Sequence, residues 1–160
     1  MISILAGILF FFSPHGGCSD AAVKQIDAAK VAVWVQAYSF TSVPIEQALF
    51  RAKDRGLDVR AIFDKSWRAE MQRNKYASAL AVENATIAKL PVLIDDKHQI
   101  AHNKVIVIDG MVVVTGSFNF TAQAETSNAE NMLVITDANI ARAYAANWLA
   151  HFAHSVAPTP

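Results

Sequence analysis

The sequence predicts an α/β domain in which helices cover both faces of a mixed β-sheet. Short apolar segments rich in β-branched and aromatic residues alternate with segments whose apolar residues recur at helical spacing. The dipeptide Asp109-Gly110, set between two apolar runs, predicts a hairpin. The chain has 160 residues, 53% of them hydrophobic and 18% charged, which suits one domain with a substantial core.

The first elements are expected to be a strand, a helix and a strand. A strand over Ile8–Ser13 is predicted because Ser-Pro-His-Gly-Gly ends it abruptly. A helix is expected over Asp20–Ala29, and a buried central strand over the β-rich segment Val31–Tyr38. Apolar residues recur at helical spacing at Ala22, Val23, Ile26 and Ala29.

A second helix is expected in the next segment. Ser42 offers an N-cap, and Pro44 suits the first helical turn. Gly56 should end this helix after about Arg55.

The rest of the chain continues the alternation. Asp137 offers the N-cap of a terminal helix that runs to about Phe152. Strands are expected over 57–63 and 91–94, on both sides of Asp109-Gly110, and over 131–136, with a more polar helix over 67–82.

The N-terminal residues 1–7 are read either as the remnant of a signal peptide or as the start of the first strand, with the domain over 8–155. The apolar run from Ile2 to Phe12 is too short to span a bilayer, so no stable membrane insertion is expected. No basic residue precedes Lys24, so the positive region of a secretory signal is lacking. Export to a bacterial periplasm or medium is nevertheless favoured, with a cytoplasmic location left open.

Charge and cysteine usage exclude some classes of function. The formal net charge is zero, which argues against strong electrostatic attraction to DNA, although residues 51–104 carry 11 basic and 7 acidic side chains. A single cysteine, Cys18, excludes an intrachain disulfide and a cysteine-built zinc site.

The chemistry is concentrated between His102 and Glu130. His102 and Lys104 lie two residues apart in a predicted strand, so they share one face, while Asp109 points to the other. After the hairpin, Gly116 permits a close backbone approach.

Ser117 and Asn119, again two residues apart, can point to the same locus as His102 and Lys104. An imidazole, a cation and neutral hydrogen-bonding groups together suit a phosphodiester. One histidine with few carboxylates does not make a two-metal site, so neither metal ligands nor a cofactor are expected.

The spacing H-x-K-x4-D-x6-G-S-x-N resembles the HKD motif of the phospholipase D superfamily. The likeness extends to Phe12-Ser13-Pro14, to the segment 35–41 and to Asn128-Ala129-Glu130-Asn131, and it resembles the small bacterial endonucleases of that superfamily. It runs from about Leu9 to His154, and the sequence holds one His-x-Lys rather than two.

The resemblance implies a homodimer that cleaves nucleic acid through a phosphohistidine. His102 of one subunit would attack phosphorus, and the partner's His102 would act as acid and then base. Lys104 and Asn119 would hold the non-bridging oxygens with support from Ser117, and Glu130 would hydrogen-bond one imidazole nitrogen. Asp109 and Gly116 would be structural.

Two other functions stay open. A phospholipase D acting on phospholipid headgroups would use the same chemistry, and a non-catalytic nucleic-acid-binding dimer would use none. Glu125 is a nearby carboxylate that competes with Glu130 for the catalytic role. The other histidines are interpreted as surface or structural residues: His15, His98, His151 and His154.

Overall fold

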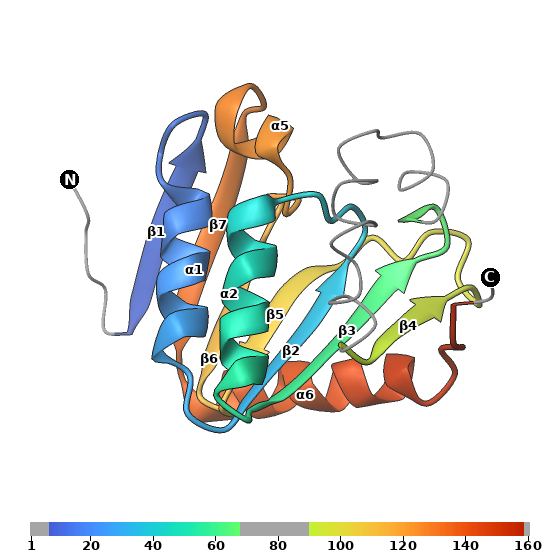
Figure 1. The fold of residues 1–160 in the computed structure, drawn as a ribbon. Helices are drawn as coiled ribbons and strands as arrows, with labels where there is room; N and C mark the ends of the chain where they lie inside the picture. Colours follow the sequence, from blue (N-terminus) through green and yellow to red (C-terminus); the bar gives the residue numbers. More distant parts are fainter. Residues whose placement is uncertain (1–6, 68–89, 159–160) are drawn as a thin grey trace.

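The computed structural model describes residues 7–67 and 90–158, and these form one seven-stranded mixed sheet with helices on both faces (Figure 1). The order across the sheet is β1-β7-β6-β5-β2-β3-β4. The strands are β1 (Ile8–Ser13), β2 (Ala32–Ala37), β3 (Asp58–Asp64), β4 (Val92–Asp95), β5 (Lys104–Ile108), β6 (Val112–Gly116) and β7 (Glu130–Thr136). The predicted fold class is therefore confirmed.

The pairing pattern brings the ends of four strands together along one border of the sheet, called the sheet edge below. β2, β3 and β4 are parallel, whereas β5 runs antiparallel to β2. The carboxyl ends of the parallel strands therefore meet the amino end of β5, with Ala37 opposite Lys104 and Asp64 opposite Asp95. Ligand sites in open α/β sheets commonly form at such carboxyl ends.

The helices bury their apolar stripes on the two faces. Helices α1 (Cys18–Ala28) and α2 (Val43–Asp54) cover one face, and α6 (Ala138–Phe152) covers the other (Figure 1). On the α6 face, the fully buried Trp148 stacks on Trp34 with ring centroids 4.9 Å apart, and its Nε1 donates to the Val35 carbonyl oxygen at 2.9 Å. These contacts fix α6 across the sheet.

Local sequence accounts for the turns and caps. Asp109 and Gly110 both have positive φ, 54° and 64°, as the predicted hairpin turn requires. The Asp137 side chain accepts hydrogen bonds from the backbone of Asn139 and Ile140 at 2.8 and 2.9 Å, which caps α6. Gly116 has φ 154°, and a Cβ built there would lie 2.3 Å from the Asn131 carbonyl oxygen, so only glycine fits.

Most predicted elements lie within a residue or two of their observed bounds, and the first strand, Ile8–Ser13, is confirmed. Within residues 7–67 and 90–158 one helix was not predicted: α5 (Ala122–Thr126), whose N-cap Thr121 accepts a hydrogen bond from the Ala124 backbone at 3.1 Å. The helix expected over 67–82 lies outside the described residues from residue 68 onward, as do residues 1–6 of the N-terminal segment.

Candidate active site

His102 and Lys104 lie at the sheet edge where β5 begins. His102 was expected within the strand, but β5 starts at Lys104, and His102 is an exposed residue of the preceding loop. Both side chains meet the Tyr38 ring, which follows β2: the His102 ring centroid is 4.8 Å from it and Lys104 Nζ is 5.1 Å from it. The two side chains therefore contact the same ring, although His102 lies outside the strand to which the alternation argument applied.

Lys104 is buried, with 6% of its surface exposed. Its Nζ donates to the His102 carbonyl oxygen at 2.7 Å, which fixes the ammonium beside the histidine. Burial lowers the pKa of Lys104 below its ordinary value, and the negative charge of Glu130 partly offsets this effect. A desolvated cation of this kind interacts strongly with a phosphate oxygen.

A carboxylate at the start of β7 and a hydroxyl directly after β6 are hydrogen-bonded to each other. Ser117 Oγ donates to Glu130 Oε2 at 2.6 Å and accepts from the Asn131 backbone at 3.0 Å. Asn128 Nδ2 donates to Glu130 Oε1 at 3.1 Å. Because Gly116 lets β6 approach Asn131 so closely, Ser117 and Glu130 are held together in one geometry.

The hydrogen bond that the resemblance implies between Glu130 and the imidazole is not formed between these two described residues. Glu130 begins β7 and faces Ser117 across the β6–β7 pair, while His102 precedes β5 on the other side of β6. The Glu130 oxygens accept from Ser117 and Asn128 instead. The contact with imidazole stays a prediction.

Asn119 carries an amide oxygen without a partner. The Oδ1 atom is buried and forms no hydrogen bond within the described ranges 7–67 and 90–158. A buried acceptor of this kind is costly unless a ligand or water satisfies it. The Asn119 carbonyl oxygen accepts from the Thr121 backbone at 2.7 Å, which fixes the loop that carries the amide.

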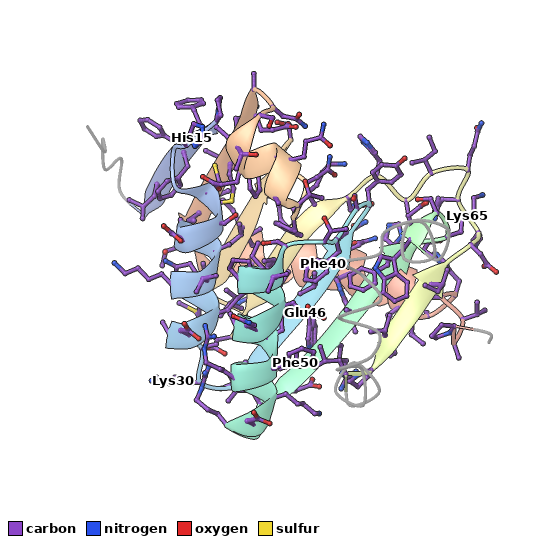
Figure 2. The ribbon with its side chains drawn as sticks, turned by 45° about the horizontal axis from the view of Figure 1, so that its top comes forward. His15, Lys30, Phe40, Glu46, Phe50 and Lys65 are labelled. Atoms are coloured by element: carbon purple, nitrogen blue, oxygen red, sulfur yellow. The ribbon has the colours of Figure 1, made fainter. Side chains whose placement is uncertain are left out.

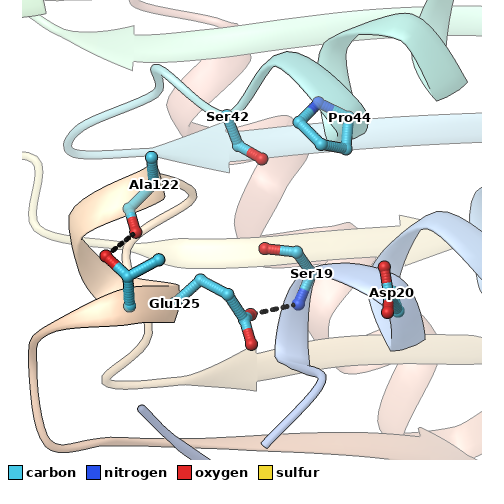
Figure 3. Close-up of a pocket in the computed structure, with 7 residues that line it drawn as sticks. Ser19, Asp20, Ser42, Pro44, Ala122 and Glu125 are labelled. Atoms are coloured by element: carbon cyan, nitrogen blue, oxygen red, sulfur yellow. Dashed lines mark hydrogen bonds between the residues drawn. The ribbon is translucent and has the colours of Figure 1, made fainter. Parts of the chain in front are cut away.

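Glu125, the competing carboxylate, has a structural role. Its two oxygens accept from the backbone N–H groups of Gly17 and Ser19, at 3.1 and 2.8 Å, so the side chain caps the amino end of α1 (Figure 3). It also lines a pocket of about 240 Å³ together with Ser19, Asp20, Ser42, Pro44, Ala122 and Thr126. That pocket contains none of the residues predicted to do chemistry.

Asp109 lies at the opposite end of β5 from Lys104. Its carboxylate accepts from three successive backbone N–H groups, those of Lys30, Val31 and Ala32, at 2.9, 2.8 and 2.9 Å. Burial opposes its ionisation, but the three hydrogen bonds prevail and hold the pKa of Asp109 below its usual range. Figure 2 shows Lys30 at one end of the molecule and Lys65, which follows β3, at the other. Asp109 thus acts far from His102.

Two buried carboxylates near His102, at the ends of β3 and β4, were not predicted from the sequence. Asp64 ends β3 and accepts from the Ala101 backbone at 2.7 Å, directly before His102. Asp95 ends β4 and accepts from the His98 backbone at 3.4 Å. The signal available in the sequence was an acidic residue at the end of an apolar strand. The two carboxylates hold the segment that carries His102 against the ends of β3 and β4.

An imidazole and a desolvated ammonium lie together where the parallel strands of the sheet end, and these groups suit the binding of a phosphodiester. The family described as "Cardiolipin synthase, PLD-like domain" matches residues 22–152. The chain therefore belongs to the phospholipase D superfamily, a superfamily of phosphodiesterases.

Relatives with assigned names differ in the activity that their names state. A phospholipase D from Rickettsia conorii is 41% identical over 138 residues, which are 86% of this chain and 66% of that protein. A mitochondrial cardiolipin hydrolase from Xenopus tropicalis is 34% identical over 107 residues, 67% of this chain and 48% of that protein. The chain thus spans about two thirds of the length of the first relative and about half of the second.

Solved structures match over nearly the whole chain. Nuc, a phospholipase D family member from Salmonella typhimurium, superposes with a TM-score of 0.81 at 33% identity, over 92% of this chain and 95% of Nuc. NucT from Helicobacter pylori superposes with a TM-score of 0.78 at 21% identity, over 94% of this chain and 98% of NucT, which shows a shared fold. Among the described residues, no helix has the length and apolar character needed to cross a membrane.

Proposed function

We propose that the protein is a nonspecific endonuclease that cleaves DNA, with RNA as a second substrate, through a phosphohistidine and without a metal in the reaction. The observation that carries this proposal is the placement of His102 and the buried Lys104 against the same Tyr38 ring, with the Lys104 ammonium hydrogen-bonded to the His102 backbone. The superposition on Nuc supports it, because this chain covers 95% of that small protein.

The reaction needs two imidazoles, and each chain holds one HKD motif. We place the two in a homodimer whose two-fold axis brings the motifs together. His102 of one subunit attacks phosphorus, the P–O bond to the leaving group breaks, and the leaving oxygen takes a proton from the partner's His102. That second imidazole then takes a proton from water, whose oxygen attacks phosphorus and breaks the P–N bond.

The other residues stabilise charge in this scheme. Lys104 has little freedom to move, because its Nζ is already bonded to the His102 carbonyl oxygen, so it is preorganised for a non-bridging oxygen. Asn119 would orient its amide so that its N–H groups meet a second oxygen. The hydrogen bond from Ser117 to Glu130 would keep the negative charge of Glu130 close to the Lys104 ammonium and the imidazoles.

Cleavage is proposed to be nonspecific because the candidate groups recognise phosphate, which carries no sequence information. The neutral net charge predicts weak binding that depends on the local basic excess, so affinity should fall with added salt.

A phospholipid headgroup is the second candidate substrate. The names of the Rickettsia and Xenopus relatives favour it. Ile100, two residues before His102, is 55% exposed and offers one apolar contact for an acyl chain.

Parallel assays on plasmid DNA and on phosphatidylcholine vesicles, both in EDTA, would separate the two substrates. Nicking without lipid hydrolysis is the expected result, and the reverse would place the protein among the lipid phosphodiesterases. His102→Ala should abolish cleavage without unfolding the chain, because His102 is exposed. His15→Asn, which removes another exposed histidine at a positive φ of 60° that asparagine tolerates, should cleave normally.

The dimer makes a separate prediction. Light scattering should give about twice the 17.4 kDa of one chain at the concentrations at which the protein cleaves DNA. A monomer that cleaves at full rate would require a proton donor other than a second His102.

A further inference from the structure

Four side chains from three parts of the chain converge on one point beside β4. Asp95 ends β4, His98 lies in the segment leading to His102, and His151 and His154 lie at the end of α6 and in the turn after it. Each offers one ligand atom, and the four atoms all lie within 4.8 Å of one another. Sequence reasoning treated these histidines one by one as surface or structural residues and did not bring them together.

The Asp95 carboxylate is the centre of this cluster. Its side chain is fully buried, and its oxygens lie 3.0 Å from His98 Nδ1, 2.7 Å from His151 Nδ1 and 3.3 Å from His154 Nε2. The three imidazole rings also meet one another, with centroids 4.8 to 5.4 Å apart. Three imidazole nitrogens and one carboxylate oxygen are thus close enough together to share one metal ion.

Hydrogen bonding alone does not satisfy this cluster. His154 Nε2 is buried and has no hydrogen-bond partner in the described part of the chain, although it faces Asp95 Oδ1. A bound cation would provide this nitrogen with a partner.

We propose that Asp95, His98, His151 and His154 bind one divalent transition-metal ion, with Zn²⁺ as the best fit. Three imidazoles and one carboxylate are ligands that Zn²⁺ takes, whereas Ca²⁺ and Mg²⁺ require mostly oxygen ligands. A tetrahedral shell with bonds of about 2.0–2.1 Å separates its ligand atoms by about 3.4 Å. The nitrogens lie 2.7 to 3.3 Å from Asp95, and all four ligand atoms lie within 4.8 Å of one another, so side-chain rotations that bring the nitrogens closer together and move them away from Asp95 would admit the ion.

This site is separate from the reaction centre and would act by positioning it. The ion would join β4, the end of α6 and the segment 96–103, whose His98 is four residues before His102. The same segment is already held by Lys65 Nζ, which donates to the His98 carbonyl oxygen at 2.9 Å, and by Asp64 at Ala101. A metal here therefore fastens the loop that delivers His102. Only the positioning of His102 rests on the proposed function; the binding of the ion does not.

The test uses untagged full-length protein, stripped with EDTA, desalted and titrated with Zn²⁺. We expect one ion per chain by calorimetry and elemental analysis, and a Tm increase of roughly 5–10 °C when Zn²⁺ is in 100-fold excess over its Kd. His154→Ala and His98→Ala should each weaken binding at least tenfold, and His98, 44% exposed, can be removed with little effect on folding. His102→Gln removes a histidine outside the cluster and should bind Zn²⁺ as the unmodified chain does.

Absence of stoichiometric Zn²⁺ binding at micromolar concentrations, or binding that both cluster variants retain, would overturn the site. These readouts do not involve cleavage, so they are independent of the nuclease proposal. A His102→Gln chain that binds Zn²⁺ but leaves DNA intact supports both proposals. Cleavage that persists in EDTA while the Tm falls indicates a structural ion outside the reaction. Loss of cleavage at an unchanged Tm indicates a metal in the reaction, and it would refute the proposed mechanism and the purely positioning role.

Discussion

Replacement of Asp109 by asparagine tests whether the aspartate of the HKD motif is structural. The carboxylate receives three backbone N–H groups: Oδ1 accepts from Val31 and Ala32, and Oδ2 accepts from Lys30. In Asp109→Asn the amide oxygen can keep the pair at Val31 and Ala32. The amide nitrogen then faces the Lys30 N–H, so one hydrogen bond is lost and the other two lose their charge assistance.

The magnitude follows from these three contacts. One lost hydrogen bond costs about 1 kcal/mol, and the loss of charge assistance on two partly exposed bonds adds about 1 kcal/mol more. The free energy of unfolding should therefore fall by about 2 kcal/mol, which corresponds to roughly 4–8 °C in Tm for a chain of this size. Urea denaturation of the original chain and of Asp109→Asn measures the difference directly.

The pH dependence of the difference in unfolding free energy between the original chain and Asp109→Asn provides a second check. The pKa of Asp109 is lower in the folded than in the unfolded chain, so its contribution is fully present above the unfolded value of about 3.9. It is lost as pH falls through the folded pKa. The gap between the two proteins should be constant above about pH 5 and should shrink in more acidic solution. A variant with unchanged stability but greatly reduced cleavage would refute the reasoning and place Asp109 in the reaction.

Two further predictions concern local packing and reactivity. Gly116→Ala should lower the free energy of unfolding by about 3 kcal/mol in urea denaturation, because its Cβ would lie 2.3 Å from the Asn131 carbonyl oxygen. The control Gly110→Ala, whose Cβ would meet nothing within 4 Å, should lower it by about 1 kcal/mol. Equal losses of stability in the two variants would contradict the close approach at Gly116. Burial, with a smaller contribution from Glu125, raises the pKa of the Cys18 thiol to about 11, so at pH 8 iodoacetamide should alkylate the folded chain at least roughly 200-fold more slowly than the urea-unfolded chain. Mass spectrometry would follow this reaction, and similar rates in the two states would show that Cys18 is accessible.

The sequence predicted the strands and most helices because each carries its own local signal. Apolar period and caps located β1, α2 and α6, and the Asp-Gly dipeptide located the β5–β6 hairpin. The short helix α5 was missed because five residues are too few for an apolar period to show. The order of the strands depends on contacts between distant segments, and local patterns do not contain that information.

The candidate site was predictable in its motif and not in its surroundings. Side chains two residues apart in a strand point to the same face of the sheet, so His102 and Lys104 could be grouped from the sequence alone. The Tyr38 ring and the carboxylate of Asp64 reach the site from β2 and β3, which only the tertiary structure brings there. Asp95 and His154 are likewise far apart in the chain and close in space.

The pairing of the C-terminal segment with β4 has a consequence for solubility. β4 has β3 on one side, and on its other side Ile94 and Val156 exchange two backbone hydrogen bonds of 2.8 and 2.9 Å. An edge strand with free N–H and C=O groups is a template on which other chains can aggregate. A chain cut after Phe152 would expose this template at Ile94, so C-terminal truncations should be judged by their tendency to aggregate as well as by their activity.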